Sequence, residues 1–392
     1  MRPILLLFGL ILLFAIEILR VYFIMPFPGS QRSDTVGLAY FLNNNILWLR
    51  IIALLIVLPP LLYYFQKGRT GWKIVLTTIV LFYGLVVYLF NFRFLADKMF
   101  YQPREKSFAG AGTDTTGRDK LVIGVALQGE AKAYPIEVIG YHHQVKDTVG
   151  GQPVLVTYCT VCRTGRVYNP FIKGHYTSFR LVGMDHFNAM FEDEDTKSWW
   201  QQATGLAITG PLRGKRLAEI PSAQMRLGDW MVLHPDSRTL QPDTNFKARY
   251  ADLKGYDEGT IEGSLERRDS GSWKFKSWVI GVKLHGRTKA YDWNRLVARR
   301  VILDTIGQDH LLLTLEPNNR TFYVLANTDS LRFQYDPSTH TLKDERTQST
   351  WQPDGACTAG PLKGQRLAPV QAYQEFWHSW KTFHPATTGY PG

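Results

Sequence analysis

The sequence has little cysteine and none of the common catalytic signatures. Cys159, Cys162 and Cys357 are the only cysteines among 392 residues, too few for a disulfide framework, so only the close pair invites a chemical interpretation. The chain contains no Gly-x-Ser-x-Gly, P-loop, Gly-x-Gly-x-x-Gly or His-Glu-x-x-His motif. It therefore gives no support for hydrolase, nucleotide-dependent or metalloprotease activity, and no catalytic residue is predicted.

Long basic runs are absent as well, although the formal net charge is +11 and the pI is 9.4. No run of five or six basic residues and no nucleic-acid-binding motif occurs, so we expect no nucleic-acid partner. The basic excess is interpreted as a solvated or lipid-facing surface. The mean hydropathy of -0.16 hides a strong asymmetry, because the apolar residues crowd between Pro3 and Phe94.

Three apolar runs predict a membrane anchor over residues 1–100. They cover residues 3–25, 46–65 and 74–92, and each is close to the ~20 residues that cross a ~30 Å hydrocarbon layer. The first run is too long, and lacks the cleavage site, for a cleaved signal peptide. Glu17, Arg20 and Arg50 lie near helix ends, where we expect them to snorkel to the interface.

The positive charges give mixed information on orientation. Lys67, Arg69 and Lys73 favour a cytoplasmic loop between the second and third helices, whereas Arg93 and Lys98 follow the third helix directly. A short Met-Arg-Pro start before a signal-anchor-like helix favours an external module. We therefore expect a multi-pass protein of the cell membrane whose remaining residues form an extracytoplasmic module.

That module is predicted to contain a tandem internal repeat. Residues 122–158 match residues 279–315 at a constant offset of 157, and residues 204–221 match 354–370 at an offset of 150. Such self-similarity is typical of duplicated structural units. The predicted organisation is a linker at 101–120, a first repeat at 121–240, a polar connector at 241–276 and a second, degenerate repeat at 277–392.

Each repeat is expected to be a β-rich α+β unit, the two forming one soluble module after the three transmembrane helices. The first is predicted to have strands at 121–126, 153–158 and 166–168, and a helix of about two turns from Pro135. A closing helix capped by Ser222 is expected at 222–233.

Cys159 and Cys162 form a Cys-x-x-Cys between two strand-like stretches. A thioredoxin-type pair precedes a helix, whose dipole lowers the first thiol's pKa. Here Arg-Thr-Gly-Arg-Val-Tyr follows, without helical periodicity. A hairpin turn of this kind is typical of a metal knuckle. Three interpretations stay open: a transition-metal site, a structural or redox disulfide, and unreactive thiols.

Further ligands for a metal would be histidines. His142 and His143 precede the pair by about one strand, and His186 lies downstream. The predicted ligand set is therefore Cys159, Cys162 and at least one of these histidines, suited to zinc, copper or iron. His142, His143, Cys159 and Cys162 correspond, in this order, to Arg299, Arg300, Glu316 and Asn319. The second repeat therefore lacks the site.

The stretch KAYPIEVIGYHHQVKDTVGGQPVLVTYCTVCRTG, with SWWQQATGLAITGPLRGKRL after it, resembles the bacterial domain-of-unknown-function family number 3179. The resemblance is strong over residues 120 to about 240 and weak in the second repeat. The matching positions are His142, Cys159, Cys162, Trp200, Thr204 and Gly205, while His143, Thr160 and Arg163 depart from the pattern.

The resemblance implies an external module but no established reaction. Three hypotheses follow: metal binding through Cys159, Cys162 and a histidine; thiol–disulfide exchange with another envelope protein; and a non-catalytic binding scaffold with a structural disulfide.

Overall fold

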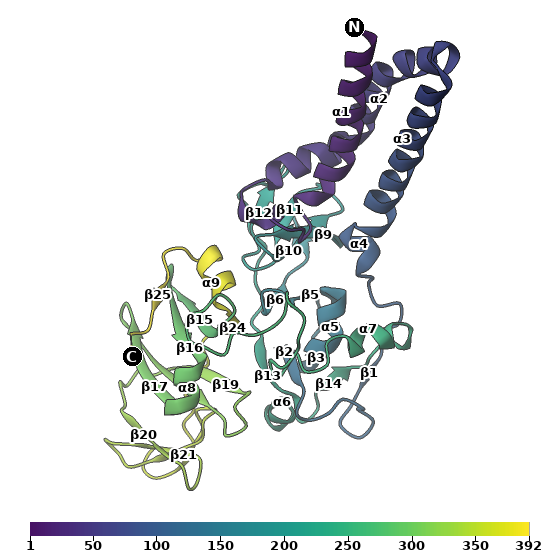
Figure 1. Cartoon of the computed structure of the whole chain (residues 1–392). Coiled ribbons are helices and arrows are strands. Elements are labelled where there is room, and N and C mark those ends of the chain that lie inside the picture. The colour runs from purple at the N-terminus through teal and green to yellow at the C-terminus, as the bar shows by residue number, and fades with distance from the viewer. Residues whose placement is uncertain (392) are drawn as a thin grey trace. The chain divides into compact units, whose positions relative to one another are not determined.

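The fold is mixed α+β and rich in strands, with three long apolar helices near the start of the chain (Figure 1). The computed structural model describes residues 1–391; residue 392, the end of the predicted second repeat, lies outside them. The chain divides into two compact units. The first comprises residues 1–101, 177–201 and 206–216, and the second comprises residues 102–176, 202–205 and those from 217 onward.

The first unit contains three helices that are long and apolar enough to cross a membrane. They are α1 (Arg2–Tyr22), α2 (Val36–Lys67) and α3 (Thr70–Tyr88), which continues as the π-helical turn η2 (Leu89–Arg93); the short helices η1 (Ser30–Arg32) and α4 (Ala96–Met99) flank them. Helix α2 begins ten residues before the predicted span. Its extra turns carry Ala39 and Tyr40, which pack on a sheet of the same unit.

The ionisable groups of these helices do not snorkel as expected. Glu17 is fully buried, and its carboxylate accepts hydrogen bonds from Arg50 Nε at 2.5 Å and Nη2 at 2.7 Å. Asn91 Nδ2 in η2 donates to the same carboxylate at 3.0 Å, and Arg20 Nη2 donates to Asn91 Oδ1 at 2.7 Å. The carboxylate of Glu17 is thus paired between the helices, because an unpaired buried charge would be costly.

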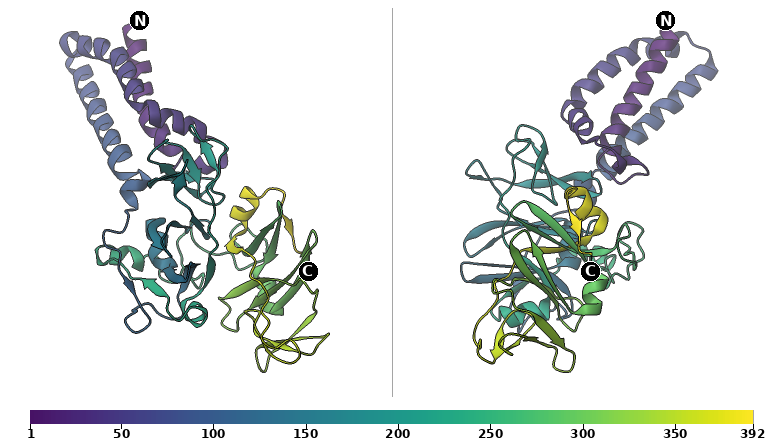
Figure 2. Two further views of the ribbon diagram at one scale, coloured as in Figure 1. Left: turned by 180° about the vertical axis from the view of Figure 1, so that it is seen from behind. Right: turned by 90° about the vertical axis from the view of Figure 1, so that its left-hand side faces the viewer.

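A four-stranded sheet completes the first unit and lies against the ends of α1 and α2 (Figure 2). Its order is β12-β11-β10-β9. The N–H of Met184 donates to the carbonyl of Ile24 at 2.7 Å, and the ring of Trp199 packs edge-on against Tyr40. The strands are β9 (Phe179–Asp185), β10 (Asn188–Asp193), β11 (Trp199–Gln201) and β12 (Ala207–Thr209).

The second unit opens with a five-stranded sheet, β1-β14-β3-β2-β13, and a three-stranded sheet, β4-β5-β6. Helix α5 (Ile136–His142) connects them and begins one residue after Pro135. The strands are β1 (Phe108–Ala109), β2 (Leu121–Leu127), β3 (Glu130–Pro135), β4 (Gln144–Val149), β5 (Gln152–Cys159), β6 (Thr164–Tyr168), β13 (Ala223–Arg226) and β14 (Arg238–Leu240), beside the small pair β7 (Phe171–Ile172) and β8 (His175–Tyr176).

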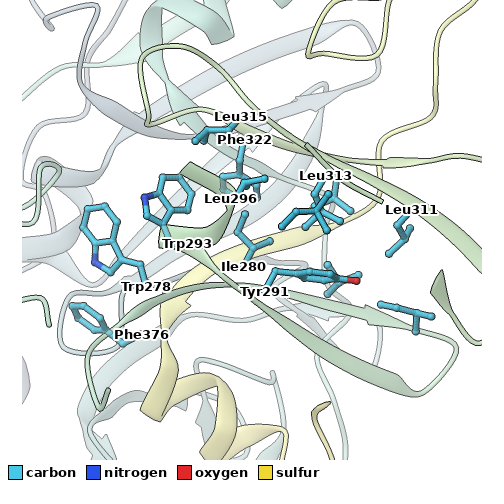
Figure 3. Close-up of a cluster of buried hydrophobic side chains, with 14 residues drawn as sticks. Trp278, Ile280, Tyr291, Trp293, Leu296, Leu311, Leu313, Leu315, Phe322 and Phe376 are labelled. Carbon is cyan, nitrogen blue, oxygen red and sulfur yellow. The ribbon is translucent and has the colours of Figure 1, made fainter. Parts of the chain in front are cut away.

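Residues 277–391 form three further sheets, ordered β24-β15-β16-β25, β17-β18-β19 and β20-β21-β22-β23. Figure 3 shows their main core, in which Trp278, Trp293 and Phe322 pack with Ile280, Tyr291 and leucines. The elements are β15 (Trp278–Leu284), β16 (Arg287–Asp292), α8 (Trp293–Arg299), β17 (Val301–Ile306), β18 (Asp309–Leu315), β19 (Phe322–Ala326), β20 (Phe333–Asp336), β21 (Thr341–Asp344), β22 (Thr350–Trp351), β23 (Cys357–Ala359), β24 (Ala372–Phe376), α9 (Trp377–Phe383) and β25 (Thr388–Gly389).

The predicted closing helix at 222–233 is wrong in its first half. Residues Ala223–Arg226 form β13, which pairs with β2, and only Leu227–Leu233 are helical as α6. Ser222 is therefore not its cap. Pairing with a buried neighbouring strand outweighs the helix propensity of Ala, Gln, Met and Arg. The polar stretch 241–276 also contains short helices, η3 (Thr244–Phe246) and α7 (Lys247–Ala251).

Candidate functional site

The Cys-x-x-Cys lies in a hairpin, as its strand-like flanks predict. β5 ends at Cys159, β6 begins at Thr164, and these two residues are paired across the hairpin. Both sulfurs are fully buried, and no disulfide joins any cysteine in residues 1–391. Burial, and then the hydrogen bond between the two thiols, raises the pKa of Cys162 well above its ordinary value. A thiol in such surroundings is a poor nucleophile.

The hairpin is covered by the C-terminal end of the chain. The N–H of Phe376 donates to the carbonyl of Cys162 at 3.0 Å, and Ser379 hydrogen-bonds the Cys162 thiol. The His378 ring stacks on Phe275 at 4.2 Å between centroids. Burial lowers the pKa of His378 to about 4, so this imidazole is neutral at pH 7. Residues more than 200 positions downstream therefore help to enclose the cysteine pair.

Arg163, directly after the pair, adopts φ = 54° and is buried. The left-handed region is unusual for a non-glycine residue, so the surroundings must hold it there. Its Nε donates to Gln374 Oε1 at 2.9 Å and its Nη1 to the carbonyl of Tyr256 at 3.2 Å. The guanidinium also lies 3.9 Å from the ring centroid of Trp278, a cation–π geometry.

Arg166 anchors the same junction. Its side chain is 2% exposed, and its Nη2 forms an ion pair with Glu375, which is 1% exposed. The guanidinium lies 3.4 Å from the ring centroid of Tyr373, and its Nε donates to the carbonyl of Ala203 at 3.2 Å. This side of the junction is thus filled by charged and aromatic groups that satisfy one another.

The predicted histidine ligands have other partners. His142 Nε2 is 2.7 Å from the Tyr250 hydroxyl, and His143 Nδ1 is 3.2 Å from the carbonyl of Tyr141. Burial lowers the pKa of His143 to about 4. His186 belongs to the first unit, where a hydrogen bond to Asp185 at 2.6 Å raises its pKa.

The structure therefore brings Cys159 and Cys162 together but gathers no complete metal site from the predicted ligands. Across residues 1–391, no group of three or more His, Cys, Asp or Glu side chains is placed to hold a metal ion.

A cavity of about 750 Å³ lies within the second unit, between residues 124–126 and 221–234 on one side and residues 322–325 and 354–372 on the other. Most of its wall is apolar, and Trp230 and Tyr323 face it from the two sides. His234 packs on the Trp230 ring at 4.1 Å, and burial lowers its pKa. Other lining residues are Met225, Leu233, Phe322, Val324, Leu325, Leu367, Val370, Gln224, Gln371, Asp354 and Arg366.

Sequence reasoning missed both this cavity and the part played by residues 241–276. Tyr256 in that stretch is buried, and its hydroxyl donates to the carbonyl of Thr160 in the cysteine turn at 2.8 Å. Its neighbour Asp257 accepts from the N–H of Leu121 at 2.8 Å. The available signal was the presence of five aromatic residues within a connector interpreted as polar: Phe246, Tyr250, Tyr256, Trp273 and Phe275.

Comparison with known proteins identifies the family. The model of the family DUF3179, described as a protein of unknown function, matches residues 102–387. No curated protein and no solved structure gives a significant match. The match covers most of the chain and includes the cysteine hairpin, the cavity and the residues around them. The chain therefore belongs to the DUF3179 family.

Proposed function

We propose that this protein is a membrane-anchored binding module that holds a small apolar or amphipathic molecule in the cavity between its two segments, residues 121–240 and 277–391. The cavity itself carries the proposal. Mostly apolar clefts of a few hundred Å³ with a small number of polar groups are the usual form of small-molecule sites. Here Trp230 and Tyr323 supply aromatic surface, and Gln224, His234 and Gln371 supply polar groups.

We further propose that the two segments are copies of one unit. Equivalent positions in them make the same contacts. The N–H of Leu227 donates to the carbonyl of Lys120 at 2.8 Å, and the N–H of Trp377 donates to that of Ser277 at 2.9 Å. The offsets are 150 for the donors and 157 for the acceptors, the same offsets that the sequence match gives.

Close helix–strand packing supports the same proposal. A Cβ on Gly124 would collide with the ring of Trp230, and one on Gly281 would collide with that of Trp380. The sheet order β13-β2-β3-β14 corresponds to β24-β15-β16-β25. Tyr134 donates to Asp147 just as Tyr291 donates to Asp304, at 2.7 and 2.8 Å.

The two copies face each other as in a two-fold dimer. Gln224 Nε2 donates to Gln374 Oε1 at 3.0 Å, and these residues are equivalent by the offset of 150. A residue that contacts its own equivalent lies on the symmetry axis of an isologous interface. Each position on one side of that axis therefore has an equivalent position on the other side, although the residue there can differ.

The cavity arises where that symmetry is broken. The counterparts of Arg166, Tyr373 and Glu375 are Tyr323, Ala223 and Met225 by the same offsets. We call the side with Arg166, Tyr373 and Glu375 the closed side, and the side with Tyr323, Ala223 and Met225 the open side. The open side has no buried ion pair at these positions, and the methyl group of Ala223 stands where the closed side has the ring of Tyr373. The sequence thus leaves space on one side of a junction that is full on the other.

The three apolar helices support a multi-pass anchor in the lipid bilayer. Lys67 at the end of α2, Arg69 in the turn after it and Lys73 in the first turn of α3 favour a cytoplasmic position for this turn, which would place residues 102–391 outside. Reporter fusions at Gly68 and after residue 391 test this orientation, because the two fusions should report opposite compartments.

The binding proposal is tested with bromoundecanol, an apolar probe whose bromine quenches nearby tryptophan. The full chain in nanodiscs should show saturable quenching that is lost in Trp230→Phe, because Trp230 lines the cavity. Trp380→Phe is the matched control. Trp380 is the equivalent residue of the second segment and does not line the cavity, so the Trp380→Phe protein should still show the saturable quenching. Circular dichroism checks that both variants fold. Equal loss in both variants, or no saturable quenching, would refute the proposal.

Metal or redox chemistry at Cys159 and Cys162 is the second candidate, because the two thiols contact each other in one turn. As a redox pair they would give two electrons and two protons to the disulfide of an envelope protein and become a disulfide themselves. With His142 or His143 they would instead hold zinc, copper or iron. Counting metal and thiols in one sample purified without chelating resin, beside Cys159→Ser, separates these alternatives from a static clasp.

A further inference from the structure

We propose that a second cleft, between residues 257–268 and the helix α8 side of the second segment, binds an oxyanion: a carboxylate or a phosphate. The cleft has a volume of about 320 Å³ and is separate from the cavity proposed above. Its wall includes Asp257, Arg268, Trp278, Asn294 and Asn318. The proposal rests on which polar groups of this wall have partners and which do not.

Two donors in the wall have no acceptor among residues 1–391. They are the Nε of Arg268 and the Nε1 of Trp278, both buried. A third buried atom without a partner, Asp257 Oδ1, belongs to the same wall. Buried polar groups in native proteins are nearly always paired, so three unpaired ones around one cleft indicate a missing partner.

All three groups are able to donate. Burial raises the pKa of Asp257 to about 7, so a substantial share of its carboxyl groups carries a proton at neutral pH. Its Oδ2 accepts from the N–H of Leu121 at 2.8 Å, which leaves Oδ1 to carry that proton. A ligand rich in acceptors, rather than one with donors of its own, complements this wall.

The positive charges near Trp278 point the same way: Arg268 lines the cleft, and Arg163, which does not line it, contacts the same indole. Arg163 and Arg268 both lie 3.9 Å from the centroid of Trp278, and neither has a carboxylate within salt-bridge distance among the described residues. Glu258 is already paired with Arg320 at 3.0 Å. Two guanidinium groups therefore share one indole with no carboxylate at salt-bridge distance, and an oxyanion beside Arg268 would offset their repulsion.

Oxyanion chemistry fits the shape of the donors as well. A guanidinium presents parallel N–H groups that match two oxygens of a carboxylate or phosphate. Arg268 Nη2 is already engaged with Asn294 Oδ1 at 2.8 Å, which fixes the plane of the guanidinium. The Trp278 indole N–H then adds a neutral donor from the neighbouring wall.

The test is calorimetric titration of the full chain in detergent with sodium phosphate and, separately, sodium acetate, against sodium chloride at matched ionic strength. Saturable binding of phosphate alone identifies a phosphate site, binding of acetate alone identifies a carboxylate site, and both results support the proposal. Trp278→Phe keeps an aromatic ring in contact with Arg163 and Arg268 but removes the indole N–H that has no partner. We expect it to fold normally and to bind the anion at least tenfold more weakly.

Arg268→Gln should weaken binding further, whereas Arg332→Gln, which removes an exposed arginine that does not line the cleft, should leave it unchanged. Two results would overturn the proposal. One is the absence of phosphate and acetate binding beyond that of chloride, which would mean that water alone satisfies these groups. The other is equal binding by wild type and Trp278→Phe.

Discussion

If residues 121–240 and 277–391 are copies of one unit, as we propose, the two sides of the junction between them are built from corresponding positions but have different contents. On the closed side, Arg166 pairs with Glu375 under the ring of Tyr373, and the cysteine turn lies close by. On the open side, Tyr323 and Met225 stand at the positions of Arg166 and Glu375, and a cavity of about 750 Å³ remains.

In the proposal above, the closed side holds the two segments together and the open side takes the ligand. A buried ion pair with a full set of hydrogen bonds favours one arrangement of the two segments, because any sliding would leave a charge unpaired. The open side carries no such constraint.

The largest expected effect comes from breaking the closed side. Glu375→Gln removes the buried counter-charge of Arg166 and leaves it only the more exposed Glu219; loss of one partner of a buried ion pair typically destabilises a protein by about 3–5 kcal/mol. Urea denaturation followed by fluorescence measures the change. Glu219→Gln is the control, because Glu219 is 35% exposed at 3.6 Å from Arg166 and should cost below about 1 kcal/mol.

A graft sharpens this test. The double change Arg166→Tyr with Glu375→Met places the open side's residues on the closed side and removes both charges together. It should recover most of the stability lost in Glu375→Gln, because replacing a buried ion pair by packed apolar groups is often neutral. A double variant as unstable as the single one would show that the two sides are not interchangeable.

The next effect is a pH dependence that should differ between the sides. Burial raises the pKa of Asp257, near Arg163, to about 7, and that of Glu316, near Tyr323, also to about 7. A folded pKa above the unfolded value means that stability is greatest below pH 4 for this group and falls as pH rises to about 7.

The expected loss for Asp257 is on the order of a few kcal/mol between pH 4 and pH 7, and it should be smaller for the less buried Glu316. Asp257→Asn should flatten the pH profile of the unfolding free energy more than Glu316→Gln does. A profile unchanged by Asp257→Asn would mean that this carboxyl is ionised in the folded protein.

A smaller effect tests whether the two segments are equivalent. Gly124→Ala and Gly281→Ala each force a methyl group into the ring of a tryptophan, Trp230 or Trp380. Overpacking of this kind costs about 1–3 kcal/mol. The two variants should be destabilised by similar amounts in thermal denaturation. A large change in only one would break the proposed correspondence between the segments.

The sequence was sufficient for local features. It predicted the strand–turn–strand around Cys159 and Cys162 because the flanking residues lack a helical period, and it predicted three apolar helices from their length. It was wrong at 223–226, where pairing with β2 overrides helix propensity. The α2 extension was missed because its extra turns owe their helical state to packing on Trp199.

The site was less accessible to sequence reasoning. The prediction that a histidine joins Cys159 and Cys162 depends on side-chain directions, which the sequence does not give; in the structure His142 Nε2 lies 2.7 Å from the Tyr250 hydroxyl. The cavity depends on residues about 150 positions apart meeting across a junction, such as Ser222 and Gln371. The offsets identify Tyr323 as the counterpart of Arg166, but only the fold shows that both face the same junction.

The most direct test of the account fills the open side. Ala223→Tyr gives the cavity the side chain that Tyr373 provides on the closed side, and Ala203→Ser, outside the cavity, is the control. Bromoundecanol affinity is measured for each full-length protein in nanodiscs. The account predicts at least tenfold weaker binding for Ala223→Tyr with the fold intact, and unchanged binding for the control. Wild-type affinity in a folded Ala223→Tyr variant would contradict the assignment of the cavity as the binding site.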